Sequence, residues 1–249
     1  MSRSNAQSVD PAEIEKFERL AAQWWDPEGK FRPLHRFNPA RLTFIRDRLA
    51  AHLGRDPEDE RPLVGLKLLD LGCGGGLLAE PLTRLGARVT GIDAAEKNIA
   101  VARLHAEQQR LDIDYRHATA EELAARGEIF DAVLNMEVVE HVADVTAFMT
   151  AAGALVRPDG LMVAATLNRT AKAFFLAVVG AEYVLRWLPR GTHDWRRFLK
   201  PSELEVVLRS AGLEMTELTG VVYNPLGDSW HLAPRDLDVN YMALAVKRG

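Results

Sequence analysis

The stretch KLLDLGCGGG, residues 67–76, decides how the rest of the chain folds. A short apolar run stops abruptly at glycines, and a helical pattern follows over residues 77–85. This order predicts a strand, a tight turn and the start of a helix. Glycines let the backbone of such a turn adopt open dihedral angles and approach a ligand closely. Because the first N–H groups of a helix have no partner within it, the stretch predicts a binding site at this turn.

A second apolar run, residues 87–92, ends in Asp93, about 20 residues after Gly72. An acidic residue at the end of the next strand can hold both ribose hydroxyls of a nucleoside. Asp70 lies just before the turn, where a carboxylate repels a pyrophosphate and suits a cationic amino group. S-adenosylmethionine has an ammonium, a sulfonium and an adenosine but no phosphate. The two aspartates therefore favour S-adenosylmethionine as the cofactor.

The spacing of the glycines separates two classes of nucleotide-binding enzyme. Gly72, Gly74 and Gly76 read G-x-G-x-G, and Leu77 stands where a dinucleotide-binding loop has its third glycine. A nicotinamide-dependent dehydrogenase, the rival enzyme class, is therefore disfavoured. Together with the two aspartates, the loop resembles motif I and the acidic end of motif II of the class I methyltransferases.

Composition limits the class of protein further. The chain has 249 residues, of which 47% are hydrophobic and 27% charged, as in a soluble globular protein. Its net charge of −4 predicts no nucleic-acid partner. Cys73 is the only cysteine, so no intramolecular disulfide can form and a cytoplasmic location is expected. No apolar stretch reaches the roughly 20 residues of a membrane span.

Strand and helix patterns alternate through the middle of the chain. Predicted strands cover residues 66–71, 88–92, 113–116, 129–135 and 161–166, with helices at 77–85, 94–110 and 147–156. A later helix at 201–211 and two strands at 214–223 and 240–247 follow. We predict an α/β, Rossmann-like fold with a mostly parallel seven-stranded sheet and a terminal antiparallel hairpin. Ligands of such sheets bind beyond the carboxyl ends of the strands, where Met136 also falls.

Residues 1–60 are expected to form an N-terminal helical extension to a methyltransferase domain at 61–249. A helix begins after Asp10, a proline-punctuated, cationic loop covers residues 31–41, and a second helix covers 42–53. The loop is expected to fold over the cofactor. Arg41 could pair with the methionyl carboxylate through two hydrogen bonds, or its charge could simply be solvated.

The run NMEVVEHV, residues 135–142, is the second informative stretch. If it enters a helix, Glu137, Glu140 and His141 share a face and form the start of a divalent metal site. Mg²⁺ is favoured, with Zn²⁺ or Mn²⁺ as alternatives. A metal would lower the pKa of an acceptor hydroxyl, and Glu140 and His141 are the catalytic candidates. His141 alone could instead act as the general base, or the carboxylates could merely favour a helix N-terminus.

Several stretches together resemble the ubiquinone-biosynthesis O-methyltransferases: residues 17–25, 33–41, 68–76, 137–142, 179–185, 191–194, 198–201 and 239–242. The resemblance extends from about Ala12 to the end of the chain. It implies an S-adenosylmethionine-dependent enzyme that methylates two hydroxyl groups of polyprenylated phenol and catechol intermediates. By resemblance, the cofactor contacts are Arg41, Gly72, Asp93 and Met136, and the metal-linked motif is Glu137, Glu140 and His141.

The segment 168–200, inserted after the fifth strand, has an apolar run followed by a basic flank. This pattern predicts a helix that lies in an anionic membrane interface, or a lid helix packed on the active site. The first alternative predicts peripheral contact with the inner face of the membrane, where a polyprenyl substrate and other ubiquinone-biosynthesis enzymes would be met. A non-catalytic membrane scaffold is the remaining rival, and the intact glycine loop argues against it.

Overall fold

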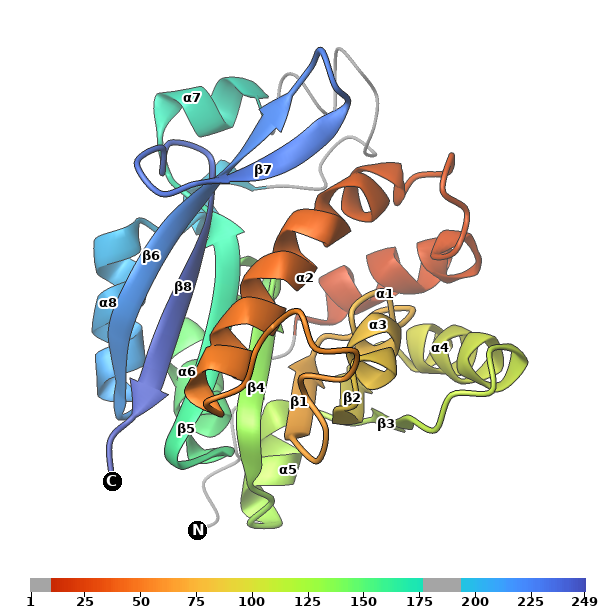
Figure 1. The fold of residues 1–249 in the computed structure, drawn as a ribbon. Coiled ribbons are helices and arrows are strands. Elements are labelled where there is room, and N and C mark those ends of the chain that lie inside the picture. Colours follow the sequence, from red (N-terminus) through yellow and green to blue (C-terminus); the bar gives the residue numbers. More distant parts are fainter. Residues whose placement is uncertain (1–9, 177–193) are drawn as a thin grey trace, which may run out of the picture.

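The computed structural model describes residues 10–176 and 194–249, and within them the chain is built on one sheet (Figure 1). Its strands are β1 (Lys67–Leu71), β2 (Arg88–Asp93), β3 (Asp114–His117), β4 (Phe130–Met136), β5 (Val156–Leu167), β6 (Leu213–Asn224), β7 (Ser229–Ala233) and β8 (Asn240–Lys247). They lie in the order β3-β2-β1-β4-β5-β8-β6-β7. β1 to β5 pair in parallel, and β8 runs antiparallel between β5 and β6. The predicted Rossmann-like fold is confirmed.

Helices cover both faces of the sheet (Figure 1). One face carries α2 (Arg32–His52), α3 (Ala79–Arg84) and α4 (Glu96–Gln108); the other carries α5 (Ala120–Ala125), α6 (Val145–Ala154) and α8 (Pro201–Ser210). Successive residues of β1 serve the two cores, because Leu68 shares a core with Phe44 of α2 and Leu69 shares one with Phe148 of α6. Burying one such side chain stabilises the fold by about 1.5–3 kcal/mol. The described chain also includes α1 (Pro11–Leu20), α7 (Ala171–Ala173) and the 3-10 turns η1 (Ala21–Gln23), η2 (Val139–His141) and η4 (Trp195–Arg197).

The structure adds an eighth strand to the seven predicted. β7 pairs antiparallel with the second half of β6, from Gly220 to Asn224, so the predicted loop before β8 contains a hairpin. Trp230 of β7 packs on Phe37 of α2, with ring centroids 5.0 Å apart. The five residues of β7 are too few for a clear strand pattern, and contact with α2 supplies the stabilisation that the local sequence lacks.

The predicted loop at residues 31–41 is also wrong, because α2 begins at Arg32 and continues to His52. Pro33 lies in the first turn, where no N–H group is needed. Pro39 lies inside the helix, where proline costs about 3 kcal/mol. Burial of Phe37 and Phe44 against the sheet, at about 1.5–3 kcal/mol each, offsets that cost. Tertiary packing therefore overrides the proline signal.

Candidate active site

A cavity of about 250 Å³ lies at the carboxyl ends of β1, β2 and β4. Its walls come from the glycine turn after β1, the end of β2 and residues between 136 and 142. α1 and α2 complete the walls, so the N-terminal part of the chain closes the cavity. Most of the predicted cofactor residues line it: Arg41, Asp70, Gly72, Gly74, Asp93 and Met136. The seventh, Gly76, lies behind the turn, against Tyr115.

The glycine turn needs its glycines for two physical reasons. Gly72, Gly74 and Gly76 have φ angles of +64°, +53° and +92°, in the region that other residues rarely adopt. A Cβ at Gly74 would also lie 2.4 Å from the ring of Trp24, and one at Gly76 would lie 2.1 Å from the Tyr115 hydroxyl. The turn therefore combines an unusual backbone with close packing on both sides.

We expect Gly76→Ala to destabilise the fold more than Gly127→Ala does. Gly127 has a φ of +69° and no heavy atom within 4 Å of a built Cβ, so its variant measures backbone strain alone, about 1–2 kcal/mol. Gly76→Ala adds the clash with Tyr115, about 1–3 kcal/mol more. Urea unfolding of both variants measures the difference. Equal losses would mean that Tyr115 moves away without cost.

Two buried charged groups line the cavity with atoms that have no hydrogen-bond partner among the described residues. These atoms are Oδ2 of Asp70 and Nε of Arg41, and the two residues are only 2% and 4% exposed. Burial raises the pKa of Asp70 to about 7, although the charge of Arg41 opposes this shift. Burial also lowers the pKa of Arg41, against the charges of Glu137 and Asp70. An acceptor and a donor of opposite charge fit the ammonium and carboxylate of an amino acid.

Asp93 ties the glycine turn to the end of β2. Its Oδ2 accepts a hydrogen bond from the Gly74 N–H at 2.9 Å, and its Oδ1 accepts one from the Ala95 N–H at 2.8 Å. The Asn98 side chain donates to the same Oδ1 at 3.3 Å. Burial raises the pKa of Asp93, and these hydrogen bonds oppose the rise. A carboxylate has about four lone-pair directions, and three of them are in use. Oδ2 can still accept one ribose hydroxyl, and a second hydroxyl would take the place of the 3.3 Å Asn98 contact on Oδ1.

Two neighbouring tryptophans of the N-terminal part cover the turn. Trp24 lines the cavity, stacks on Phe31 with ring centroids 3.8 Å apart, and donates its Nε1–H to Asn98 at 2.8 Å. Trp25 donates its Nε1–H to the Gly75 carbonyl at 2.9 Å and stacks on His105 of α4 at 3.5 Å. One tryptophan therefore forms part of the cavity wall, and the other anchors the extension to the main fold.

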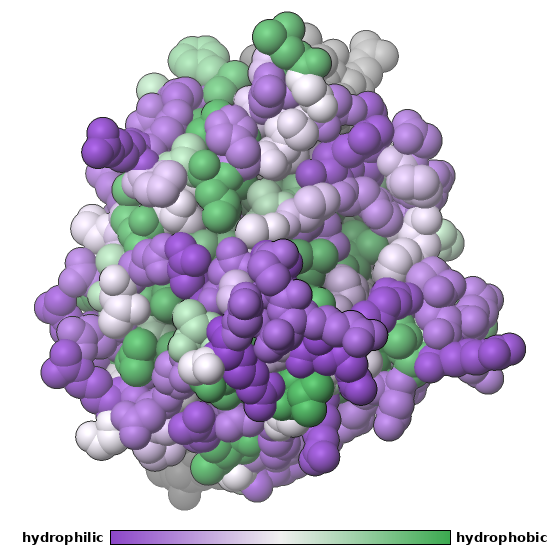
Figure 2. All heavy atoms as spheres, viewed as in Figure 1, coloured by the Kyte–Doolittle hydropathy of each residue, from purple (hydrophilic) through white to green (hydrophobic). Residues whose placement is uncertain are grey.

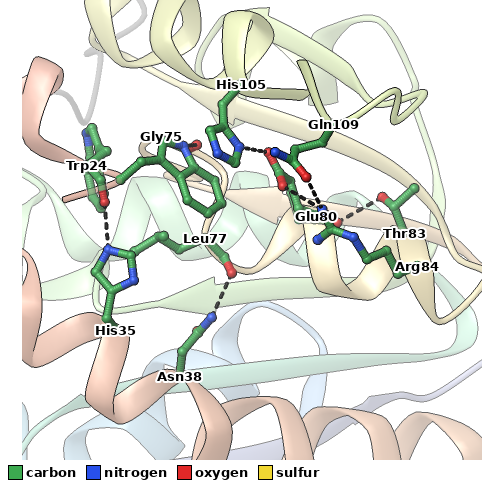
Figure 3. A network of polar contacts seen from close by, with 12 residues as sticks. Trp24, His35, Asn38, Gly75, Leu77, Glu80, Thr83, Arg84, His105 and Gln109 are labelled. Carbon is green, nitrogen blue, oxygen red and sulfur yellow. Dashed lines mark hydrogen bonds and ion pairs between the residues drawn. The ribbon is translucent and has the colours of Figure 1, made fainter. Parts of the chain in front are cut away.

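Figure 3 shows how further polar contacts hold this N-terminal part in place. His35 of α2 contacts the Trp24 carbonyl through Nε2 at 2.8 Å, and Asn38 donates to the Leu77 carbonyl at 2.7 Å. His105, under Trp25, contacts the fully buried Glu80 of α3. The cover over the cavity is thus joined to both helices that follow the first two strands.

The predicted metal group at Glu137, Glu140 and His141 does not form. Glu137 has a φ of +61° and lies outside any helix, and η2 is only a three-residue turn, so the three side chains share no helix face. Across residues 10–176 and 194–249, no group of three or more His, Cys, Asp or Glu side chains could hold a metal ion. The residues present do not fit the predicted metal.

Glu140 and His141 each have a different partner. Glu140 is 5% exposed and accepts a hydrogen bond from the Thr166 hydroxyl at 2.9 Å. Burial, and then the charge of Glu137, raise its pKa to about 8, while Thr166 opposes the rise. His141 places Nδ1 2.8 Å from Oε2 of Glu13, a residue of α1. All of these groups except Thr166 line the cavity.

Sequence reasoning missed Glu13 and Asn98 as cavity residues. Asn98 follows Asp93 by five residues, at the start of α4, and this spacing is a signal that could have placed it near the ribose site. Glu13 carries no comparable signal, because its partner His141 lies 128 residues away in the sequence. Only the docking of α1 brings the two side chains together.

Comparison with known proteins places the chain in a family. A model of the methyltransferase domain matches residues 69–164. The ubiquinone biosynthesis O-methyltransferases of Dinoroseobacter shibae and Brucella ovis are each 59% identical to this chain, over 98% of this chain and 98% of theirs. The magnesium protoporphyrin IX methyltransferase of Synechocystis, solved with bound SAH, has a TM-score of 0.63 at 21% identity, covering 94% of this chain and 95% of that one. The structure of a possible histamine N-methyltransferase of Thermotoga maritima has a TM-score of 0.65 at 18% identity, covering 95% of this chain and 99% of that one.

The solved structures share the fold, and the cavity has groups of the kind that an amino acid and a ribose require. Fold and site together define an S-adenosylmethionine-dependent methyltransferase. The dehydrogenase and scaffold alternatives are thereby set aside. At 59% identity along almost the whole length, the chain belongs to the ubiquinone biosynthesis O-methyltransferase family.

Proposed function

We propose that this enzyme methylates hydroxyl oxygens of polyprenylated phenol and catechol intermediates of ubiquinone synthesis. Relatives at 59% identity are ubiquinone biosynthesis O-methyltransferases, which supports the substrate class. One observation of the site supports the cofactor assignment. Asp70 and Arg41 line the same cavity, and each has a buried polar atom with no hydrogen-bond partner among the described residues. Both methylations of the pathway are included in the proposal, because the two acceptors share the same phenolic chemistry.

The residues of the cavity divide the cofactor between them. Asp70 would bind the ammonium and Arg41 the carboxylate of the methionyl end. Asp93 would accept the ribose hydroxyls, and Met136 would contact the cofactor from the end of β4. When bound, S-adenosylmethionine supplies a methyl group already activated by its sulfonium. The chain itself must position the acceptor oxygen and remove its proton.

We propose that His141 removes the proton from the acceptor hydroxyl. A phenol has a pKa near 10, so its hydroxyl is mostly protonated at neutral pH and needs a base. Burial and the charge of Glu137 raise the pKa of Glu140 to about 8, so most of this carboxyl carries a proton at neutral pH. His141 lines the same cavity and can accept a proton on its imidazole. Glu140 is left to shape the cavity wall beside it.

The decisive experiment is a methyl-transfer assay with S-adenosylmethionine and a short-tailed polyprenyl catechol. Turnover is expected, with the methyl group found on the ring oxygen by mass spectrometry. A protein that binds the cofactor tightly but methylates neither a catechol nor a phenol of this series would overturn the substrate class.

A chelator arm of the same assay addresses the divalent metal. The described side chains form no group of metal ligands, and the role proposed for His141 involves no metal. Activity that the chelator leaves unchanged would support His141 as the base. Loss on chelation with recovery on adding Mg²⁺ would require Glu137 and Glu140 to regroup around a cation.

Cofactor affinity is expected to fall as the pH drops below about 7, because burial raises the pKa of Asp70 to about 7. Above this pH Asp70 is ionised and attracts the ammonium, whereas below it the carboxyl is neutral. The limiting slope is about tenfold in Kd for each pH unit. Calorimetric titration between about pH 5.5 and pH 7.5 measures it. Asp70→Asn should bind weakly without this dependence, and an unchanged slope in that variant would assign the titration to another group.

We also propose that the segment 168–200 contacts an anionic membrane. Residues 177–193 of this segment lie outside the described part of the chain. Before them, Phe175 and Leu176 are 62% and 55% exposed, and after them come Arg196 and Arg197 of η4. Figure 2 shows hydrophobic spheres at the upper end, where Figure 1 places α7 and the β6–β7 hairpin.

This arrangement of apolar and basic residues supports interfacial binding. No helix in the described residues has the length and apolar character to cross a membrane. The protein should float with anionic liposomes and not with neutral ones. Failure to float while cofactor binding is retained would favour a lid.

A further inference from the structure

The N-terminal helix α1 places a carboxylate directly against the proposed base. Oε2 of Glu13 lies 2.8 Å from Nδ1 of His141, and both side chains line the cavity. We propose that Glu13 is a positioning residue that holds the His141 imidazole in its base-competent tautomer. This inference rests on the proposed function and adds to it a residue from the N-terminal extension.

The chemical reason lies in the two nitrogens of a neutral imidazole, of which one donates and the other accepts. A carboxylate at Nδ1 favours the tautomer with the proton on that nitrogen. The lone pair is then on Nε2, which is the nitrogen that can take a proton from the acceptor hydroxyl. The same carboxylate stabilises the imidazolium that forms when the proton arrives.

The local structure of His141 fixes its backbone. His141 ends the three-residue turn η2, and its N–H donates a hydrogen bond to the Val138 carbonyl at 2.8 Å. A short 3-10 turn holds the backbone but does not choose the orientation of an imidazole ring. Glu13 contacts the ring from a separate element, α1, and this contact sets the orientation of the ring.

A second contact fixes α1 in the position that this pair requires. Asp10, just before α1, accepts a hydrogen bond from Arg197 of η4 at 2.9 Å, and Arg197 lowers the pKa of Asp10. α1 thereby joins the segment after β5 to the cavity wall. The proposed base is complete only when α1 is docked, so the N-terminal extension contributes to catalysis as well as covering the cofactor.

The alternative is an ordinary ion pair that only helps α1 to dock. The side chains of Glu13 and His141 are 24% and 17% exposed, and pairs near the surface contribute little to stability. A docking role would therefore change the thermal midpoint slightly or weaken cofactor binding, and would leave the tautomer of His141 and the chemical step unaffected. These are the quantities that separate the two roles.

The test compares Glu13→Ala and Glu13→Gln with Glu15→Gln, which removes the same charge from an exposed position of the same helix. ¹⁵N NMR of the histidines, at a pH where the ring is neutral, reports the tautomer without any substrate. We expect His141 to carry its proton on Nδ1 in the wild-type protein and in Glu15→Gln, and to lose this preference in Glu13→Ala. A wild-type ring protonated on Nε2 would overturn the proposal.

Kinetics of the same variants test the consequence. Glu13→Ala should lower kcat about 10–100-fold, the usual effect of removing a group that orients a functional histidine, with cofactor Kd changed less than about twofold. The kcat of Glu13→Gln should lie between those of the wild-type protein and Glu13→Ala, because the glutamine side-chain oxygen still accepts a hydrogen bond from Nδ1–H but carries no charge. A tautomer shift without a fall in kcat would overturn the catalytic role. The expected NMR result with no turnover in the wild-type protein would instead reject the proposed substrate.

Discussion

Replacing Asp93 with alanine is expected to remove measurable binding of S-adenosylmethionine. The carboxylate would accept two ribose hydroxyls, and a hydrogen bond to a charged group contributes about 1.5–3 kcal/mol. The loss of both corresponds to a Kd raised by roughly 10²–10⁴-fold. The variant also leaves the N–H groups of Gly74 and Ala95 without their acceptor, which loosens the glycine turn. Isothermal titration calorimetry measures the change.

Asparagine should not rescue this position. Each oxygen of Asp93 accepts a backbone N–H, one from Gly74 and one from Ala95, so either orientation of an amide places an NH₂ group against a donor. Asp112→Ala, at an exposed position outside the cavity lining, is the matched control and should bind normally. Cofactor affinity within about threefold of wild type in Asp93→Ala would refute the ribose assignment.

His141→Ala is expected to lower kcat by about 10²–10⁴-fold while cofactor binding is retained. Loss of a general base typically has this effect, equivalent to about 3–5 kcal/mol in the barrier. The acceptor hydroxyl would keep its proton, since Glu140 is itself protonated at neutral pH. Single-turnover methyl transfer with saturating cofactor measures the chemical step directly.

The control for this variant is His52→Ala, an exposed histidine in the last turn of α2 and remote from the cavity lining. It should retain wild-type kcat and Kd. A His141→Ala enzyme with near-normal kcat would mean that another group removes the proton. The proposed role of Glu13 would then fail as well. The two predictions in this pair of residues therefore check each other.

The N-terminal extension gives these predictions a common physical setting. α1 and α2 supply Glu13 and Arg41 to a cavity whose other walls belong to the sheet. Trp25 and His35 hold that cover on the glycine turn through contacts with Gly75 and Trp24.

The sequence by itself determined the fold class and the cofactor end of the site. Alternating strand and helix patterns act locally, and a parallel sheet is the arrangement that buries both of their apolar faces. The positions of Gly72, Asp70 and Asp93 followed, because each stands at the carboxyl end of a strand whose neighbours are set by that pattern.

Only the tertiary structure decided the parts of the molecule that depend on contacts between distant segments. Residues 31–41 become helical, despite Pro39, because Phe37 and Phe44 are buried on the sheet. β7 forms because it can pair with β6 and pack on α2. The spacing of Glu137 and His141 predicted a shared helix face, but a positive φ at Glu137 prevents the helix. The partner of His141 is instead Glu13, because docking of α1 brings together two residues that no local pattern relates.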